Sequence, residues 1–419
     1  MRVRKRLLAI RKNRLLFLIR SKVFSNALFQ KIHGTFWRRV VFNWEHAFSN
    51  LLSLGGTSFG NRVHVFIDGD ESFVAKRDAI ASARYRVWLE TYIFEPDSIG
   101  IAIRDELMRA AKRGCDVILI YDYFGSSRVG SAFFAPLVQA GAKVFAFNPI
   151  WPWRRRGPLL FRDHRKILVV DNRIAFCGGM NIAKDYVGTK FGTSRFRDTV
   201  ISLEGPCVDD LAEIFLSSLR ETSGEDRSVG QGARRRQHGV LVQILGSNTR
   251  RNLHSIQHSM EMTLRRATKY CYFTTPYFLP FDRLRKAMIT AAERGVDVRV
   301  LTAGLSDVPL MRRASRHAYG QFLKAGIRIY EMFNRTLHAK TATIDSVYGT
   351  VGSYNLDHWS ARRNLEVNAS MWDPEIAQQL EQDFQKDLKQ SREVIMSQWE
   401  ARGMLTRVID WIAYQLMRL

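Results

Sequence analysis

The chain carries one sequence pattern twice, and this internal repeat restricts its fold more than any other feature. The segment HRKILVVD at 164–171 is matched by HAKTATID at 338–345, a constant separation of 174 positions. Upstream, RGCDV at 113–117 matches RGVDV at 294–298, and AG at 140–141 matches AG at 325–326. Downstream, the match continues through Gly178/Gly352, Gly179/Ser353 and Asn181/Asn355. Matches that recur in the same order predict two copies of one folding unit.

Each copy alternates strand-like and helix-like segments. The first is expected to have strands over 87–94, 116–121 and 143–147, with helices over 101–112 and 132–140. The second repeats that order, with strands over 270–278, 297–302 and 328–332 and helices over 283–293 and 314–325. This alternation predicts an α/β fold with helices on both faces of a sheet. We expect a first domain over 61–221, a polar linker over 222–238 and a second domain over 239–398.

The composition suits a folded protein that meets a polyanion. The 419 residues include 64 Lys and Arg against 40 Asp and Glu, a net charge of +24. Such an excess attracts nucleic acid or an anionic membrane surface, and composition does not choose between them. The four cysteines form no C-x-x-C pair, so we expect buried thiols in a reducing compartment rather than disulfides or a zinc site. No segment reaches the roughly 18 to 20 apolar residues of a bilayer span, so membrane contact is expected to be peripheral.

Both ends of the chain have amphipathic patterns. Twelve Lys and Arg residues precede the first acid, Glu45, with apolar residues between them at loosely helical spacing. We interpret residues 1–60 as a basic segment that lies on anionic lipid, the alternative being a solvated tail or a helix packed on the core. Residues 399–419 predict an amphipathic helix, either at a membrane interface or docked on its own domain. Its apolar face comprises Leu405, Val408, Ile409, Ile412, Leu416 and Leu419.

The histidine and the lysine of each repeat are two positions apart on a strand-like run. His164 therefore points to the same face as Lys166, and His338 to the same face as Lys340. A protonated lysine is a poor metal ligand, but it neutralises phosphate oxygens while an imidazole attacks phosphorus. Two such pairs predict phosphodiester chemistry on two histidines.

The H-x-K-x4-D pattern is the signature of the phospholipase D superfamily, which the chain resembles over roughly residues 61–395. RDHRK at 162–166, NRIAFCGGMNI at 172–182, RDTV at 197–200, EGP at 204–206 and TTPYF at 274–278 are similar to segments of bacterial cardiolipin synthases. The resemblance implies two tandem phospholipase D-type α/β/α sandwich domains related by a pseudo-two-fold axis, with one active site at their interface. It also implies that neither a metal nor another cofactor is needed.

The resemblance assigns roles to residues of both motifs. The implied catalytic residues are His164, Lys166, Asp171, His338, Lys340 and Asp345. His164 is the expected nucleophile, which forms a phosphohistidine, and His338 is expected to protonate the leaving alcohol and activate the incoming one. The aspartates lie an odd step beyond the lysines, so we expect them to anchor the strand and the loop. Supporting residues, which bind phosphate or orient a histidine ring nitrogen, are expected at Asn181, Asn355, Asp198, Glu366 and Ser353. For the two acids, the alternative is a surface ion pair with a neighbouring arginine.

The expected reaction makes cardiolipin by transfer of a phosphatidyl group from phosphatidylglycerol to a second phospholipid. The expected location is the cytoplasmic face of the bacterial inner membrane. Hydrolysis by a phospholipase D would use the same site with water as acceptor. A metal-independent phosphodiesterase or nuclease is the alternative from another substrate class, which the positive charge also suits. Two motifs in one chain, both with their aspartate, favour lipid, so no nucleic-acid partner is expected. The oligomeric state is not predicted.

Two further features near the first motif have less definite interpretations. The aromatic and basic residues of 151–161 are expected to form a lip that touches headgroups and acyl chains, or else a packed loop. Glu90 lies near the end of a strand that faces the site, with no assigned role.

Overall fold

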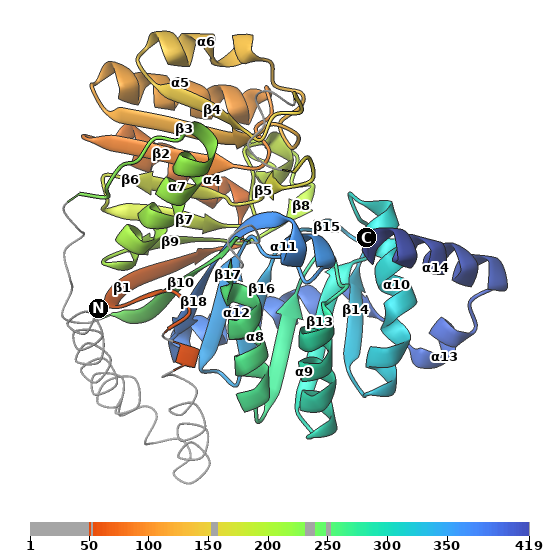
Figure 1. The fold of residues 1–419 in the computed structure, drawn as a ribbon. Coiled ribbons are helices and arrows are strands. Elements are labelled where there is room, and N and C mark those ends of the chain that lie inside the picture. Colours follow the sequence, from red (N-terminus) through yellow and green to blue (C-terminus); the bar gives the residue numbers. More distant parts are fainter. Residues whose placement is uncertain (1–49, 52, 152–157, 231–238, 249–252, 419) are drawn as a thin grey trace.

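A computed structural model describes residues 50–51, 53–151, 158–230, 239–248 and 253–418 of the chain (Figure 1). The chain folds into two similar halves that lie against each other. Most of the predicted basic segment, at 1–49, lies outside the described residues, as do positions 152–157 of the predicted lip and 231–238 of the predicted linker. Within the described ranges, no helix combines the length and the apolar character needed to cross a bilayer.

Strands and helices alternate in both halves, as the sequence pattern predicts. The first half comprises β1 (Gly56–Phe66), α4 (Gly69–Ala81), β2 (Arg86–Thr91), α5 (Ser98–Lys112), β3 (Asp116–Asp122), α6 (Ser131–Gln139), β4 (Lys143–Phe147), β5 (Arg162–Asp163), β6 (Ile167–Val170), β7 (Ile174–Gly178), the 3-10 helix η2 (Lys184–Tyr186), β8 (Phe196–Arg197), β9 (Val200–Glu204) and α7 (Cys207–Ser223). The second half comprises β10 (Val240–Asn248), β11 (Leu253–His254), α8 (Ser255–Arg266), β12 (Tyr270–Thr274), α9 (Asp282–Glu293), β13 (Asp297–Ala303), α10 (Pro309–Lys324), β14 (Arg328–Met332), β15 (Thr336–Leu337), β16 (Thr341–Ile344), β17 (Tyr348–Gly352), α11 (His358–Arg362), β18 (Asn364–Trp372), α12 (Pro374–Leu388), β19 (Ser391–Glu393), α13 (Met396–Glu400) and α14 (Met404–Arg418).

Two strands end earlier than predicted, and one helix begins five residues before its predicted start. The strands predicted to run to Phe94 and Phe278 end at Thr91 and Thr274. Beyond these points the backbone leaves the sheet, because the N–H of Phe94 donates to Ser126 Oγ at 2.9 Å and the N–H of Phe278 donates to Ser315 Oγ at 3.3 Å. The helix predicted over 314–325 begins earlier, at Pro309, since proline fits the first turn of a helix.

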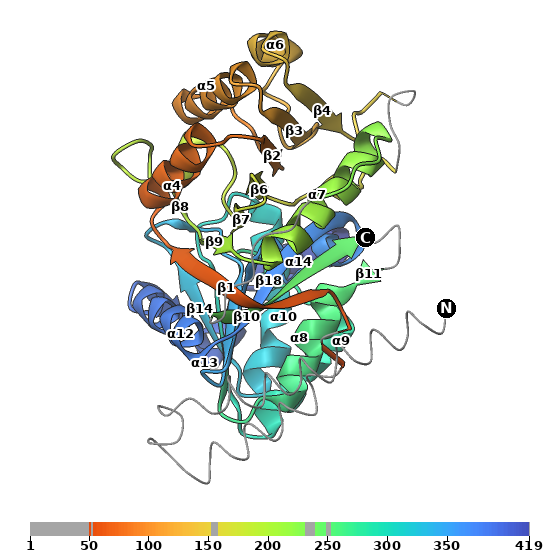
Figure 2. The same cartoon turned by 90° about the vertical axis from the view of Figure 1, so that its left-hand side faces the viewer.

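Each half contains a mixed sheet, and the two sheets meet at one pair of strands. The first sheet has the order β4-β3-β2-β6-β7-β9-β1. The second has the order β19-β14-β13-β12-β16-β17-β18-β10. The equivalent strands β1 and β10 pair antiparallel to each other, with Gly56 opposite Ile244. Antiparallel pairing of equivalent strands gives the halves an approximate two-fold relation, and Figure 2 shows β1 and β10 at the junction between them.

Helices cover both faces of each sheet. In the first half, α4, α5 and α6 pack on one face and α7 covers the other. In the second half, α8, α9 and α10 cover one face and α12 the other. Phe215 of α7 belongs to the same buried cluster as Val367 and Ala369 of β18, which come from the other half. The halves thus share a close-packed core, and this packing holds the residues of the interface in place.

The repeated Arg-Gly pairs upstream of the motifs end equivalent helices. Gly114 follows α5 with a φ of 87°, and Gly295 follows α9 with a φ of 86°. Glycine adopts this left-handed conformation at little cost, which is why it follows so many helices. The Arg-Gly pairs therefore recur because both copies need a glycine at the end of the same helix.

Candidate active site

Each motif histidine lies opposite an acidic residue of the other half. β5, which precedes His164, pairs in parallel with the start of β18. β15, which precedes His338, pairs in parallel with β8. The next residues in register are His164 and Glu366 at the first pairing, and His338 and Asp198 at the second. The backbone N–H of each histidine continues the ladder, with bonds of 3.0 Å and 2.8 Å to the other half.

Both histidines contact these acids through Nδ1. His164 Nδ1 lies 3.1 Å from each carboxylate oxygen of Glu366. His338 Nδ1 lies 2.6 Å from Asp198 Oδ2. All four side chains are buried, so neither acid forms a surface ion pair. A carboxylate at Nδ1 holds the proton on that nitrogen and leaves the lone pair of Nε2 available for attack or for proton transfer.

Burial favours the neutral form of both imidazoles, whereas the contacts with the histidines favour the ionised form of both acids. Burial lowers the pKa of His164 to about 4, against the attraction of Glu366. Burial and the neighbouring Lys340 lower the pKa of His338. Burial acts to raise the pKa of Asp198 and of Glu366, but the adjoining histidines outweigh it and both pKa values are lowered. A neutral imidazole is the form that a nucleophile or a general base requires.

The motif lysines lie beside the histidines of their own repeats. Lys166 Nζ donates to the backbone oxygen of His164 at 2.7 Å. Lys340 Nζ lies 2.9 Å from Nδ1 and 3.1 Å from Nε2 of His338. Burial lowers the pKa of Lys166 to about 7 and that of Lys340 to about 8. Lys340 also lowers the pKa of His164 and of Lys166, so the two His–Lys pairs lie within electrostatic reach of each other.

The two acids have different surroundings. Glu366 accepts hydrogen bonds from Ser353 Oγ at 2.5 Å, from Ser360 Oγ at 2.7 Å and from Asn364 Nδ2 at 3.2 Å. Asp198 accepts one from the backbone N–H of Thr199 at 2.7 Å. The position equivalent to Ser353 is a glycine in the first repeat.

That glycine, Gly179, leaves room for the second acid. A Cβ atom built on Gly179 would lie 2.2 Å from Asp198 Oδ1, which is too close for any side chain. Ser353, which was predicted as a supporting residue, donates a hydrogen bond to Glu366.

The predicted asparagines occupy different environments. Asn181 is held at both ends, because its Oδ1 accepts from the N–H of Ile93 at 3.1 Å and its Nδ2 donates to the Tyr186 hydroxyl at 2.8 Å. The Tyr186 ring in turn lies edge-on to His338, with centroids 5.2 Å apart. Asn355 Oδ1 is buried and has no hydrogen-bond partner among the described residues.

The motif aspartates lie at the other end of the motif strands. Asp171 accepts from the backbone N–H groups of Arg84, Tyr85 and Arg86, at 2.8 to 2.9 Å. Asp345 binds the equivalent N–H groups of residues 268, 269 and 270, at 2.8 to 3.0 Å. Each aspartate therefore holds the start of the neighbouring strand, β2 or β12, which supports the anchoring role expected from the odd spacing.

Two buried arginines, for which no role in the site was predicted, join the halves around the site. Arg165 donates to the backbone oxygens of Glu366 and Ser247 in the second half, both at 3.2 Å. Arg197 forms an ion pair of 2.8 Å with Asp387 of α12. The sequence signal that could have identified these arginines is their position next to site residues. Arg165 lies between the motif histidine and lysine, and Arg197 precedes Asp198.

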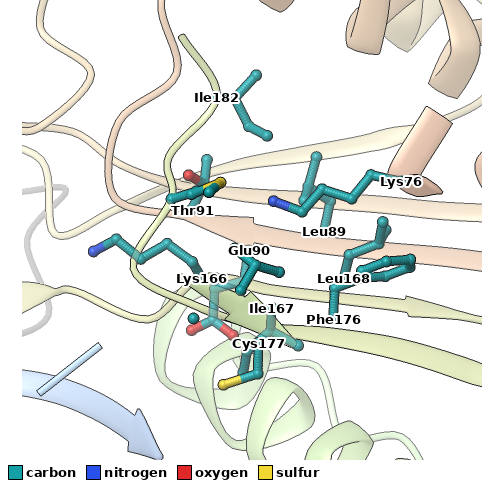
Figure 3. Close-up of a pocket in the computed structure, with 13 residues that line it drawn as sticks. Lys76, Leu89, Glu90, Thr91, Lys166, Ile167, Leu168, Phe176, Cys177 and Ile182 are labelled. Atoms are coloured by element: carbon teal, nitrogen blue, oxygen red, sulfur yellow. The ribbon is translucent and has the colours of Figure 1, made fainter. Parts of the chain in front are cut away.

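A small cavity of about 20 Å³, room for about one water molecule, lies beside Lys166. Figure 3 shows Lys76 of α4 extending into it and Glu90 lining it from β2. Glu90 is buried and accepts from Ser218 Oγ at 2.5 Å, and burial raises its pKa. Glu90 thus lies on the strand next to the motif strand β6, opposite Ile167. Among the described residues, no group of three or more His, Cys, Asp and Glu side chains is arranged to hold a metal ion.

Comparison with known proteins places this arrangement in a family. Residues 77–215 and 260–388, one segment in each half, match the family described as "Cardiolipin synthase, PLD-like domain". The chain is also 30% identical over 394 residues to cardiolipin synthase 2 of Bacillus anthracis, covering 91% of this chain and 76% of that protein. The chain belongs to the phospholipase D superfamily.

Further relatives and a solved structure support the assignment of this chain to the phospholipase D superfamily. It is 30% identical over 387 residues to the cardiolipin synthase of Halalkalibacterium halodurans, covering 91% of the chain and 75% of that protein. The structure of phosphatidylserine synthase from Haemophilus influenzae Rd KW20 matches it with a TM-score of 0.65 over 89% of this chain and 97% of the other, at 16% identity, which shows a shared fold. The family resemblance read from the two motifs and the predicted fold class are confirmed. The chain is an enzyme, a phosphatidyltransferase of this superfamily.

Proposed function

We propose that this enzyme makes cardiolipin from phosphatidylglycerol and a second phospholipid through a phosphohistidine intermediate. The observation that carries the proposal is the pair of buried histidines, each bound at Nδ1 by a carboxylate of the other half. That contact directs each Nε2 away from the acid, as attack on phosphorus and proton transfer both require. The relatives that are named cardiolipin synthases support the choice of substrate.

The reaction proceeds in two displacements at phosphorus. His164 Nε2 attacks the phosphorus of phosphatidylglycerol, the bond from phosphorus to the glycerol oxygen breaks, and His338 Nε2–H gives its proton to that oxygen. Glycerol leaves. His338, now neutral, removes the proton from a hydroxyl of the second phospholipid, whose oxygen attacks phosphorus and releases His164. The product is cardiolipin, and His338 is again protonated for the next cycle.

The surroundings support these assignments. A pKa of about 4 keeps His164 unprotonated at neutral pH, which suits the nucleophile. His338 has to carry a proton when the donor binds, and the negative phosphate raises the pKa of a neighbouring imidazole. The same charge favours the ammonium forms of Lys166 and Lys340, which then neutralise the phosphoryl oxygens. Asn181 and Asn355 are the supporting amides, which act through their N–H groups because phosphoryl oxygens accept hydrogen bonds.

We place the reaction at the cytoplasmic face of the bacterial inner membrane, with the enzyme bound peripherally to anionic lipid. The net charge of +24 suits that surface. The same charge suits nucleic acid, so the experiment includes it as a competing substrate.

The proposal is tested with purified enzyme, phosphatidylglycerol vesicles and no added metal. We expect cardiolipin and glycerol in equal amounts, with a ³²P-labelled protein intermediate from donor labelled at phosphate. His164→Asn should abolish both the label and the product. His338→Asn should slow turnover while the label still forms from a donor with a good leaving group.

Other products would contradict the proposal in distinct ways. Phosphatidic acid as the sole product shows a hydrolase rather than a transferase. Cleavage of DNA without any lipid product shows a nuclease.

A further inference from the structure

The C-terminal helix α14 turns its apolar side away from the protein. Leu405 is 74% exposed, Leu416 is 52% exposed and Trp411 is 50% exposed. They belong to an outward surface, here called the α14 face, that consists of Leu405, Val408, Ile409, Trp411, Ile412 and Leu416. An amphipathic helix of a globular protein normally buries its apolar stripe against the core. α14 instead turns its apolar stripe away from the core, which leaves a contiguous apolar surface in contact with solvent.

The side of α14 that packs on the protein contains its only acidic residue. Asp410 is buried against α10, where it binds Arg402 at 2.7 Å and Arg313 at 3.4 Å. Ala413 and Met417 lie on the same side and are also buried. Tyr414 stacks at a tilt on His317 of α10, with ring centroids 4.7 Å apart. These contacts fix the rotation of the helix, so the outward direction of the α14 face follows from the packing.

We propose that the α14 face docks on an anionic lipid surface. The exposed charges of the helix are Arg407 and Arg418, both positive, because Asp410 is buried and paired. Exposed aliphatic side chains, a tryptophan and flanking arginines are the combination that inserts into the interface of an anionic bilayer. The segment 1–49 is a poorer occupant, because its twelve Lys and Arg residues carry the same charge as the arginines of α14.

α14 is connected to the active site through α10 and the loop that precedes it. Arg313, which holds Asp410, is in the first turns of α10, the helix that follows the loop after β13. That loop contains Asp307, which accepts from the Tyr277 hydroxyl at 2.8 Å and acts electrostatically on His338 and Lys340. Leu305, Val308 and Leu310 around Asp307 are exposed as well. Docking through α14 would therefore bring this exposed loop, which is linked to His338 and Lys340, toward the lipid that supplies the substrates, and in this respect the inference rests on the proposed function.

The test measures binding of the full chain to vesicles by flotation, in a His164→Asn background that does not consume lipid. The vesicles contain equal parts of phosphatidylglycerol and phosphatidylcholine, in about 0.5 M NaCl, where the Debye length of about 4 Å screens attraction to the basic segment. We expect Val408→Ser combined with Leu416→Ser to lower the partition coefficient by about tenfold or more, because two apolar side chains no longer insert.

The matched control is Ile101→Ser combined with Val138→Ser, on α5 and α6 of the other half (Figure 1). The side chains of Ile101 and Val138 are 41% and 51% exposed, against 46% and 52% for Val408 and Leu416. Their substitution should leave vesicle binding unchanged. Equal binding by the α14 variant and the parent overturns the proposal. So does a sedimentation experiment in which the parent is a dimer and the α14 variant a monomer while vesicle binding persists, since the α14 face would then contact a second copy.

A second measurement separates this proposal from the proposed function. It is the activity on a soluble short-chain phosphatidylglycerol, without vesicles, of chains that retain His164. The α14 variant should retain that activity. If the parent binds vesicles through α14 but forms no cardiolipin from any lipid, docking stands and the proposed function fails.

Discussion

A single carboxylate at each Nδ1 determines which nitrogen of the catalytic imidazole carries the proton. Glu366→Gln preserves the size of the side chain and an acceptor oxygen for Ser360, but its amide can donate to His164 Nδ1 and so move the proton to Nε2. A protonated Nε2 cannot attack phosphorus. We expect kcat to fall by about 10³- to 10⁴-fold with little change in KM. The measurement is steady-state cardiolipin formation, with circular dichroism to confirm folding. A Glu366→Gln enzyme that forms the covalent intermediate at the parent rate would show that Glu366 does not orient His164.

The dependence of kcat/KM on pH should report the pKa values of the free enzyme's side chains. The rate should rise as pH increases through about 4, because His164 loses its proton there. It should fall in two steps as pH increases further. The first step is the loss of the His338 proton, because burial and Lys340 lower the pKa of that general acid. The second lies above about 7, because Lys166 loses the charge that binds the phosphoryl group. Lys166→Arg keeps a positive charge at all accessible pH values, so the second step should move up toward the value of about 8 at Lys340. A second step that stays in place in Lys166→Arg would exclude Lys166 as its origin.

At the scale of elements, the first residues after β7 and β17, Gly179 and Ser353, differ by one hydroxymethyl group, and the structure explains this difference. Gly179→Ser should lower activity by about 100-fold or more, because the new Cβ would displace Asp198 from His338. Ser353→Gly removes one hydrogen bond to the charged Glu366 and leaves the backbone free to keep its course. A loss of about 10-fold is expected. Both rates are measured on phosphatidylglycerol vesicles, with thermal unfolding as the control. Equal losses of activity in the two variants would contradict this explanation, because the geometry predicts that Gly179→Ser is the more damaging change.

The elements also show what could and could not be predicted from the sequence. Periodicity and the Arg-Gly pairs locate most helices and strands, because helix ends and buried strands leave local signals. The odd spacing of Asp171 indicates its anchoring role for the same reason. The partner of each histidine has no local signal: Glu366 lies 202 positions from His164, and Asp198 lies 140 positions from His338. Each acid follows the motif of its own repeat, and only the parallel pairings β5–β18 and β8–β15 exchange them. The outward orientation of α14 is also partly non-local, since Arg313, which binds Asp410 on the buried side of the helix, lies 97 positions away.

For the whole molecule, the exchange of acids means that neither half holds a complete His–acid pair. One chain contributes both halves, joined through a shared core and through Arg165 and Arg197. A mixture of His164→Asn and His338→Asn chains should therefore remain inactive, since each chain closes its own defective site. The measurement is cardiolipin formation after the two variants are unfolded together in urea and refolded, compared with the parent treated alike. Recovery of about a quarter of the parent activity or more would require halves from different chains to combine. That result would replace the intramolecular interface with an exchanged dimer built from the same contacts.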